Sequence, residues 1–333
     1  MELVPCPITG DRDFSPVLEA PDRFAPSGKS WTLVRSSSSG LVMLNPRPDS
    51  SEASKHYPEY SYDPFLHQGN CRSPRDRAYL YVSSLLLKIK AGIVMNGLDK
   101  PAAAVRLLEV GCSTGRLLLR LNKDYGIPLR NLFGIEPDRQ AAGVATEAGL
   151  LNISGTDLSE TSFDNRFDRI VFWHVLEHLH RIDAALEKAR ALLEPDGMLV
   201  IALPNIGSDD AGRYGTHWIA LDAPRHLYHF TPETLSLLLR KHGFTIVDIK
   251  AFVPDAIYNV WYSEKLDGSL SGRPFGIRSA ARAAAGTVLS VIKGIDPRKA
   301  SGFVCRAVRS NQDFGPAVTT RPSDFSSSAE ATR

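Results

Sequence analysis

The residues best suited to chemistry follow two short apolar runs of the chain. Leu107–Val110 leads into a loop of small residues at 111–115 and then into a helical pattern that begins at Arg116. Leu132–Ile135 ends in an acid, Glu136. A strand, a tight loop, a helix and a second strand with a terminal carboxylate form the arrangement by which an open α/β sheet holds a nucleoside-bearing cofactor. The glycines let the backbone approach such a ligand without a Cβ clash, and the Glu136 carboxylate can accept hydrogen bonds from two ribose hydroxyls.

The spacing within this loop distinguishes between two classes of cofactor. In the dinucleotide pattern G-x-G-x-x-G, Ser113 and Arg116 occupy the positions of the second and third glycines. The third glycine allows close packing of helix and strand, and the large side chain of Arg116 would prevent it. The pattern E/D-x-G-x-G/S-x-G instead fits Glu109, Gly111, Ser113 and Gly115. That spacing is the one used by class I S-adenosylmethionine (SAM) methyltransferases, whose cofactor has no pyrophosphate. The loop therefore favours SAM.

Alternating strands and helices must hold this loop in place. Strands are expected at 105–110, 132–136, 150–153, 168–173 and 198–203, with helices at 116–124, 138–148 and 180–193. Five such strands imply a parallel sheet that is covered on both faces. Further elements are expected as helices at 74–95, from Pro232 to Gly243 and at 275–293, and as a final strand hairpin at 244–249 and 302–308.

The composition places the chain among ordinary globular proteins. Its 333 residues are enough for about two domains, and a net charge of +2 argues against a dedicated nucleic-acid binder. The four cysteines are scattered, which is typical of a reduced cytoplasmic protein. The first ten residues do not resemble a signal peptide, and no run approaches the ~18 apolar residues that span a bilayer. We expect a cytoplasmic protein.

One region of the chain is much more basic than the rest. Residues 250–309 contain ten Lys or Arg and four Asp or Glu, which gives a local charge of +6. The helix expected at 275–293 carries Arg278 and Arg282 on its polar side. Such a helix can make peripheral contact with a membrane surface or a lipid-linked acceptor. The favoured alternative is a cap over the active site, because the apolar face is rich in alanine.

Four motifs, taken as a set, give the chain a resemblance to a known family. They lie at residues 108–115, 167–171, 173–178 and 221–231. Together they resemble bacterial class I SAM-dependent methyltransferases of the broad ubiquinone-methyltransferase-like group, over roughly residues 74–252. The resemblance implies a Rossmann-like α/β fold with a seven-stranded sheet, SAM as the cofactor, and a transferase that methylates a small-molecule acceptor.

The N-terminal segment resembles the small zinc ribbon with which many of these relatives begin. The four places of the ribbon's cysteines are held here by Cys6, Thr9, Ser36 and Ser39. A hydroxyl is not a competitive zinc ligand, so we expect a metal-free segment at 1–58. Its fold would then depend on a β-hairpin, with strands at 31–35 and 41–44, and on hydrophobic packing.

The resemblance also divides the chain. We expect a β-rich N-terminal extension at 1–58 and a methyltransferase domain at 74–309. The polar tail at 310–333, rich in Ser, Thr and Pro, is expected to be disordered.

The cofactor-binding residues are expected at the ends of the first four strands of the large sheet. Asp157 lies after the third of these and can accept a hydrogen bond from the adenine amine, although a plain turn residue fits that position equally well. Glu136 can alternatively serve as a helix N-cap. The full predicted set is Glu109, Gly111, Cys112, Gly115, Glu136, Asp157 and Trp173.

The sequence His174-Val-Leu-Glu177-His178 forms the sharpest cluster of ionisable groups. As H-x-x-E-H it matches the inverted zinc-protease motif, but that motif needs both histidines on one helix, and His174 directly follows a strand. In some quinone O-methyltransferases of the resembled group, acidic and histidine residues hold a divalent metal at this place. Magnesium prefers oxygen ligands. We therefore expect no metal, and expect Glu177 and His178 to brace the loop by hydrogen bonds.

The loop before Pro232 is expected to line the acceptor pocket. With His178, the predicted substrate-binding residues are His217, Trp218, Asp222, Arg225 and His229. The alternative is a structural loop pinned by an Asp222–Arg225 pair. His226 is the first choice for a general base and His174 the second, because a hydroxyl acceptor must lose a proton.

Methylation by SAM is a direct in-line displacement in which alignment supplies most of the acceleration. We expect O-methylation of a small molecule: a sugar, a phenol or quinone, or a secondary metabolite. A non-catalytic SAM-binding partner protein is the alternative, and an NAD-dependent oxidoreductase is disfavoured by Arg116.

Overall fold

The structure is a computed structural model that describes residues 1–25, 28–57 and 74–310. The disordered tail expected at 310–333 therefore lies outside the described residues, apart from Ser310. In the described part of the chain, no helix has the length and apolar character needed to cross a membrane.

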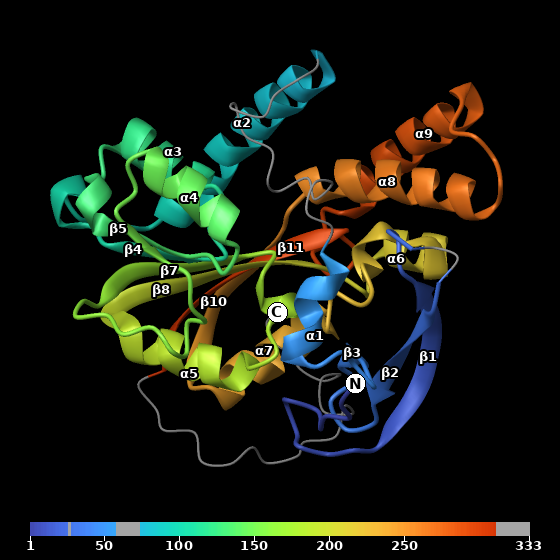
Figure 1. Cartoon of the computed structure of the whole chain (residues 1–333), viewed down its shortest axis with the longest axis horizontal. Helices are drawn as coiled ribbons and strands as arrows, with labels where there is room; N and C mark the ends of the chain where they lie inside the picture. The colour runs from blue at the N-terminus through green and yellow to red at the C-terminus, as the bar shows by residue number, and fades with distance from the viewer. Residues whose placement is uncertain (26–27, 58–73, 311–333) are drawn as a thin grey trace, which may run out of the picture.

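A seven-stranded sheet forms the centre of the molecule, as predicted (Figure 1). Its strands are β4 (Leu107–Val110), β5 (Leu132–Ile135), β6 (Asn152–Ser154), β7 (Phe167–Trp173), β8 (Leu193–Pro204), β10 (Phe244–Ala251) and β11 (Gly302–Arg309). Their spatial order is β10-β11-β8-β7-β4-β5-β6. The five strands from β8 to β6 are parallel, and β11 runs antiparallel to both β8 and β10. The expected final hairpin is thus confirmed.

The order of the strands reverses beside β4. The chain runs outward from β4 through β5 to β6 and then returns to the other side of β4 as β7. Ligands of open α/β sheets bind at such a switch point, in the crevice outside the carboxyl ends of the strands. The loop after β4 and His174 after β7 both lie at this point.

Helices cover both faces of the sheet, as Figure 1 shows. On one face lie α2 (Pro74–Met95), α3 (Arg116–Tyr125) and α4 (Arg139–Glu147), and on the other lie α5 (Ile182–Leu192) and α7 (Pro232–Lys241). Leu118 and Leu121 of α3 are buried in one core, and Leu186 of α5 and Leu235 of α7 are buried in the other. All seven residues of β7 are buried, as expected for a strand covered on both faces.

The N-terminal extension forms a second, antiparallel sheet. It contains β1 (Phe14–Pro21), β2 (Ser30–Ser36) and β3 (Val42–Leu44), so the predicted hairpin is confirmed. Its fourth strand is β9 (Tyr228–His229), which comes from the expected acceptor loop and pairs with β3. The extension is further fastened by Arg47, whose guanidinium donates to the Tyr228 hydroxyl at 2.8 Å and to the His180 carbonyl at 3.1 Å.

The four positions of the resembled ribbon meet in space. The Cys6 thiol lies 3.2 Å from the Ser39 hydroxyl, which donates to the Ser36 hydroxyl at 3.0 Å. Burial raises the pKa of Cys6, but hydrogen bonds from Ser39 and Thr9 outweigh it and lower that pKa. Trp31, Leu33, Leu41 and Leu44 are buried beside this cluster in the core shared with α5 and α7.

Two helices near the carboxyl ends of the strands were not predicted. They are α6 (Asp209–Tyr214) and α8 (Pro254–Leu270); α9 (Ile277–Lys293), which packs on α8, was predicted. The remaining short helices are α1 (Ser50–Ala53), η1 (Ser54–His56), η4 (Ala102–Ala104), η5 (Leu129–Asn131), η6 (Leu176–His178), η7 (Gly215–His217) and η8 (Ile219–Leu221).

Candidate active site

The loop after β4 is shaped by three residues with left-handed backbone: Gly111 (φ 71°), Ser113 (φ 49°) and Gly115 (φ 72°). A Cβ at Gly111 would collide with Val175, and one at Gly115 would collide with Leu150. Gly115 therefore permits the close packing of helix and strand. In the dinucleotide pattern the third glycine, at position 116, would have that role. The loop has the geometry expected from the second spacing.

Cys112 contributes its backbone to this loop. The N–H groups of Gly111 and Cys112 both donate to the Ile135 carbonyl, at 2.8 and 3.0 Å. The thiol is buried beneath Gly134, where an added Cβ would lie 2.5 Å from Sγ. Burial raises the pKa of Cys112, so this thiol is held neutral and out of reach of a nucleophilic role.

The Glu136 carboxylate spans the crevice between β4 and β5. It accepts a hydrogen bond from the Ser113 N–H at 2.8 Å and another from the Asp138 N–H at 2.9 Å. Each carboxylate oxygen has a second acceptor site, so both can still accept from a ribose hydroxyl. The alternative role of helix N-cap belongs to Asp138, whose carboxylate accepts from the Ala141 N–H at the start of α4.

Glu109 of β4 is a buried acid. Burial raises its pKa to about 8, partly opposed by the ammonium of Lys90 and reinforced by Glu136. Its Oε2 atom has no hydrogen-bond partner among the described residues. A buried carboxyl oxygen without a partner is suited to a cationic ligand group that neutralises it.

Trp173 closes the same region from β7. Its ring is buried, lies 5.1 Å from the Phe252 ring and carries the Lys90 ammonium 4.7 Å from its centroid. Its Nε1 atom has no hydrogen-bond partner in the part of the chain that the structure describes. Trp173 and Glu109 thus share Lys90 as a neighbour.

Asp157 occupies a turn after β6. Its Oδ1 atom accepts from the backbone N–H and the hydroxyl of Ser159, at 2.8 and 2.6 Å. The turn role considered from the sequence is therefore present. The preceding Gly155 lies close to the Glu136 carbonyl, so this segment borders the cofactor crevice, and contact of Asp157 with an adenine remains a prediction.

His174 stands at the carboxyl end of β7 with a left-handed backbone (φ 53°). Its Nε2 atom lies 3.3 Å from the Asp255 carboxylate of α8, and its Nδ1 atom lies 3.6 Å from the Glu177 carboxylate. Burial alone would lower the pKa of His174, but these two acids outweigh it and raise the pKa to about 9. His174 is therefore an imidazolium at neutral pH.

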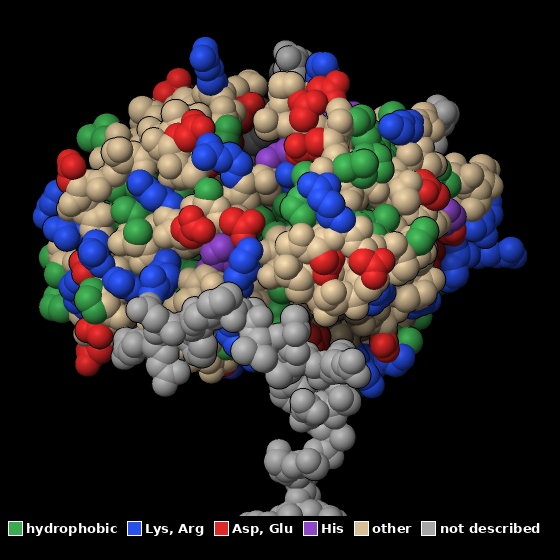
Figure 2. Space-filling model, turned by 90° about the horizontal axis from the view of Figure 1, so that it is seen from below, with side chains coloured by type: hydrophobic (Ala, Val, Ile, Leu, Met, Phe, Trp, Pro, Cys, Tyr) green, Lys and Arg blue, Asp and Glu red, His purple; other side chains and the backbone are tan. Residues whose placement is uncertain are grey.

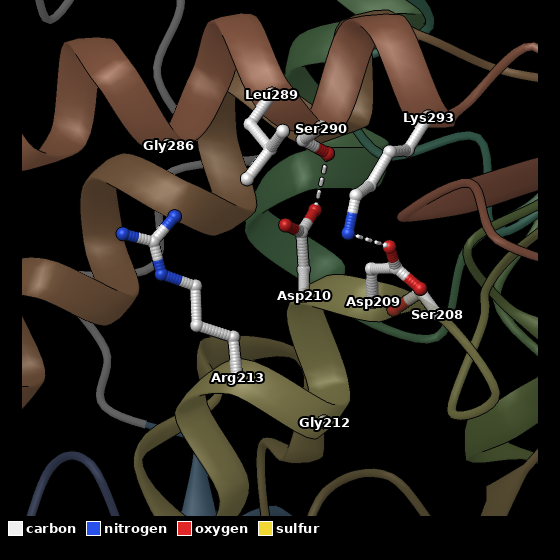
Figure 3. Close-up of a pocket in the computed structure, with 9 residues that line it drawn as sticks. All are labelled: Ser208, Asp209, Asp210, Gly212, Arg213, Gly286, Leu289, Ser290 and Lys293. Carbon is white, nitrogen blue, oxygen red and sulfur yellow. Dashed lines mark hydrogen bonds and ion pairs between the residues drawn. The ribbon is translucent and has the colours of Figure 1, made fainter.

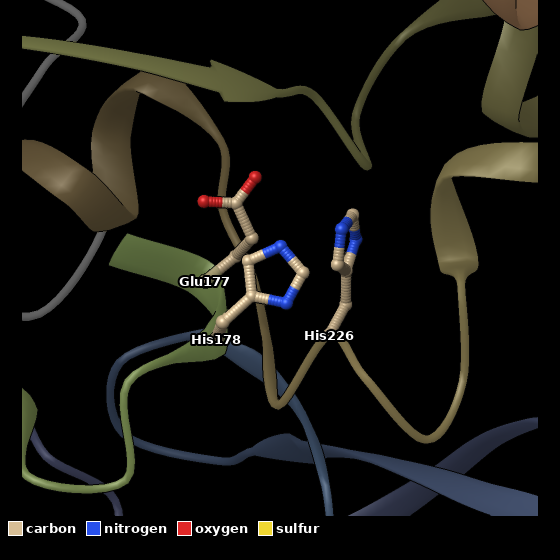
Figure 4. A group of neighbouring side chains, drawn as sticks. All are labelled: Glu177, His178 and His226. Carbon is tan, nitrogen blue, oxygen red and sulfur yellow. The ribbon is translucent and has the colours of Figure 1, made fainter. Parts of the chain in front are cut away.

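His178 and His226 meet edge to face beside Glu177, with ring centroids 4.6 Å apart (Figure 4). His226 Nδ1 bonds to the Ala220 carbonyl at 2.8 Å, so Nδ1 carries the proton and Nε2 has a free lone pair. His178 Nδ1 lies 3.0 Å from the Arg225 carbonyl. Burial, and next His178, lower the pKa of His226 well below 6.5. His226 is therefore neutral.

These three side chains also form a candidate cation site. One ligand atom each from Glu177, His178 and His226 lies within 4.8 Å of the others. A carboxylate and two imidazoles are ligands that zinc and related ions accept. The imidazolium of His174, however, lies 3.6 Å from Glu177 and would repel a divalent ion there. His178 makes the bracing hydrogen bond that was expected, to the Arg225 carbonyl, whereas neither carboxylate oxygen of Glu177 has a hydrogen-bond partner among the described residues.

Asp222 and Arg225 lie in a buried ionic network that reaches the N-terminal sheet. Arg225 bonds to Asp222 at 2.8 Å and to Asp22 at 2.9 Å, and Arg23 lies 2.7 Å from Asp222. Burial raises the pKa of Asp222, but Arg23 and Arg225 outweigh it and lower the pKa to about 2. This is the geometry of the pinned structural loop that the sequence left as an alternative to substrate contact.

The other predicted substrate residues are spread apart. His217 is half-exposed in η7 and bonds to Asp267 of α8 at 2.8 Å. Trp218 is buried in the core, and its Nε1 atom has no partner among the described residues. His229 lies in β9 with its ring centroid 6.2 Å from that of His226, and burial lowers its pKa to about 4.

Three residues of the site were missed from the sequence: Tyr57, Lys90 and Asp255. The Tyr57 hydroxyl lies 3.1 Å from His178 Nδ1, and its ring is close enough to feel the charges of both Glu177 and Glu136. None of the three lies in a motif, and each reaches the site by a long-range contact.

A separate cavity of about 410 Å³ lies between α6 and α9 (Figure 3). Its polar lining is largely self-paired: Asp210 accepts from Ser290 at 2.5 Å, and Lys293 lies 2.6 Å from Asp209. None of the predicted site residues lines it. These pairs hold α9 against α6.

The chain matches a family model described as a methyltransferase domain over residues 75–249, more than half of its length. Ubiquinone biosynthesis O-methyltransferase of Cereibacter sphaeroides (strain ATCC 17025) is 27% identical over 183 residues, covering 51% of this chain and 72% of that one. The protein of the same name from Rhodopseudomonas palustris (strain BisA53) is 25% identical over 173 residues, covering 48% and 66%.

Similar solved structures include the [4+2]-cyclase SpnF (22% identity, TM-score 0.45), which covers 74% of this chain and 86% of its own. Magnesium protoporphyrin IX methyltransferase of Synechocystis PCC 6803 is 13% identical with a TM-score of 0.48, covering 79% and 100%.

The matched residues include the loop after β4, Glu136 and His174 through His226. SAM is the cofactor of this family. The chain belongs to the methyltransferase domain family and is a SAM-dependent methyltransferase with the class I, Rossmann-like fold.

Proposed function

We propose that this methyltransferase transfers the methyl group of SAM to the oxygen of a small, weakly acidic hydroxyl acceptor such as a phenol. The observation that carries the proposal is the pairing of a neutral His226, with a free Nε2, and an imidazolium at His174 near the switch point. A base and a cation together suit an acceptor that loses a proton and becomes anionic. A phenol ionises near pH 10, well above the lowered pKa of His226, so the proton transfer depends on stabilisation of the phenolate by the His174 cation. The relatives named as O-methyltransferases support oxygen as the methylated atom.

The cofactor half of the site follows from the loop and its two acids. Glu136 would bind the ribose hydroxyls, and the backbone of residues 111–115 would pass the methionine portion. Glu109 would face a cationic group of the cofactor. SAM supplies an activated methyl group, so the protein needs to orient the two reactants and to exclude water.

In the acceptor half, we assign His226 as the general base. Its Nε2 atom would take the hydroxyl proton while the Nδ1 bond to Ala220 fixes the ring. The resulting cation would lie about 4.0 Å from the Asp222 carboxylate, which would stabilise it.

His174, the second choice for a base, is better suited to a different role. With a pKa of about 9 it already carries its proton at neutral pH. We assign it to stabilising the negative charge that develops on the acceptor oxygen. Asp255 and Glu177 would hold it in the charged state.

The test measures cofactor binding and turnover separately. Calorimetry is expected to show binding of SAM and of its demethylated product but not of NAD. Radiolabelled SAM is then offered with a panel of phenols, catechols, sugars and amines. We expect His226→Gln to retain SAM binding and to lower kcat on a phenol by about 10²–10⁴-fold. SAM binding without transfer to any acceptor would favour a non-catalytic SAM-binding protein, and transfer to amines alone would overturn the O-methylation proposal.

A further inference from the structure

Helix α9 exposes its large apolar residues and buries small ones. The residues that it buries are small: Ser279, Ala283, Gly286 and Ser290. Its large apolar residues face solvent, with Ile277 90%, Val288 59% and Ile292 61% exposed. A surface helix normally buries its large apolar residues against the core, and α9 instead buries its small ones; the cap over the active site remains a prediction.

The inner face of α9 is closely packed at Gly286. A Cβ added at Gly286 would lie 2.6 Å from the Arg213 guanidinium and 3.0 Å from Val260 of α8. The helix therefore approaches α8 through its small residues. Its large apolar residues form a separate outer face, defined here as Ile277, Val288, Leu289, Val291 and Ile292.

Basic side chains flank this outer face. Arg278, Arg282 and Lys293 lie on α9, and the helix contains no acidic residue. Arg282 and Lys293 each pair with one acid of a neighbouring helix, Glu264 and Asp209, and still expose 44% and 47% of their side chains. A nonpolar stripe beside basic residues is typical of helices that lie in the interface of an anionic membrane.

Other exposed apolar residues extend from the same side of the molecule. Figure 1 shows that α2 and the α8–α9 pair project from one end. On α2, Tyr81, Leu85 and Ile89 are exposed at four-residue spacing, with the exposed Lys88 beside them. The opposite end, seen in Figure 2, shows acidic and basic side chains interspersed and hydrophobic ones in small, scattered groups.

We propose that the outer face of α9 docks the enzyme on an anionic lipid surface. The apolar side chains would enter the boundary between headgroups and acyl chains, and the three basic residues would meet lipid phosphates. A second copy of the chain is a poorer occupant. Two such faces in symmetric contact would bring together helices that carry basic residues and no acids.

Co-sedimentation of the full chain with vesicles tests this surface. We expect binding to phosphatidylcholine vesicles that contain phosphatidylglycerol, weaker binding to phosphatidylcholine alone, and release at high salt because exposed charges are screened. Val288→Ser with Ile292→Ser is expected to weaken the partitioning at least tenfold. The matched control is Leu151→Ser, which removes an apolar side chain that is 79% exposed outside α9.

The double variant removes only exposed side chains, so its SAM binding and thermal unfolding should match the wild type. Wild-type protein that stays in the supernatant with both kinds of vesicle would overturn the proposal, as would equal binding by the double variant. A dimer in sedimentation velocity that the double variant abolishes, without vesicle binding by the wild type, would assign the face to a second copy instead.

Discussion

His174 Nε2 lies 3.3 Å from the carboxylate of Asp255, which joins the carboxyl end of β7 to the first turn of α8. The contact links the switch point of the sheet to α8, a helix that was not predicted from the sequence. Asp255 also raises the pKa of His174. This histidine lies beside the cofactor loop, since its neighbour Val175 packs against Gly111.

Asp255→Asn is expected to reduce the pH dependence of stability. Folding raises the pKa of His174 from 6.5 to about 9. Such a group stabilises the folded protein fully below pH 6.5, and this stabilisation is lost as the pH rises to about 9. In the wild type this contribution, on the order of 1–3 kcal/mol, should disappear between pH 6.5 and 9. Urea unfolding at pH 6 and pH 9.5 measures it. Asp267→Asn, which removes the His217 contact, is the control; equal slopes for wild type and Asp255→Asn would contradict the assignment.

Glu136→Gln is expected to weaken SAM binding by about ten- to a hundredfold, as for loss of charged hydrogen bonds worth ~1.5–3 kcal/mol. The new amide would direct an NH₂ group at the N–H of either Ser113 or Asp138, both of which now donate to the carboxylate. Calorimetry with SAM measures the change. Asp138→Asn keeps the helix cap and should bind SAM nearly as the wild type does. Unchanged affinity of Glu136→Gln would remove this residue from the cofactor site.

Arg225→Met separates a structural role from substrate binding. The substitution leaves Asp22 and Asp222 buried without their shared guanidinium, which is expected to cost about 3–5 kcal/mol of unfolding free energy. Chemical denaturation measures the loss. If Arg225 instead binds the acceptor, KM should rise while stability remains within ~1 kcal/mol of the wild type.

Chelators are expected to leave methyl transfer unchanged. The imidazolium of His174 beside Glu177 disfavours a divalent ion among Glu177, His178 and His226. Activity is measured before and after EDTA treatment, and again after addition of zinc, manganese or magnesium. Loss of activity that one of these ions restores would show that the three residues hold a metal.

The cofactor half of the site was largely predictable because it is local in the sequence. Gly111, Gly115 and Glu136 follow short apolar strands, and both glycines adopt the positive φ that their spacing indicates. Short apolar runs between helical patterns likewise predicted the strands of the large sheet, and the family resemblance predicted that there are seven.

The acceptor half was less predictable because it depends on contacts distant in sequence. Tyr57 reaches His178 across 121 positions, and Asp255 reaches His174 across 81. Burial lowers the pKa of both His226 and His174, but Asp255 and Glu177 outweigh it at His174 alone, so the two histidines differ in charge at neutral pH. The outward turn of α9 was missed because periodicity reveals an apolar stripe but not the direction in which it faces.

Because β3 pairs with β9, the acceptor half of the active site depends on the N-terminal extension, whereas the cofactor half does not. Val42 and Met43 pair with the two residues of β9, two positions after His226. Cutting away the first 48 residues would expose a bare strand edge and loosen the proposed base, while the loop after β4 would keep its supports from β5 and α4. Such a fragment would still recognise its methyl donor and would have lost the means to use it.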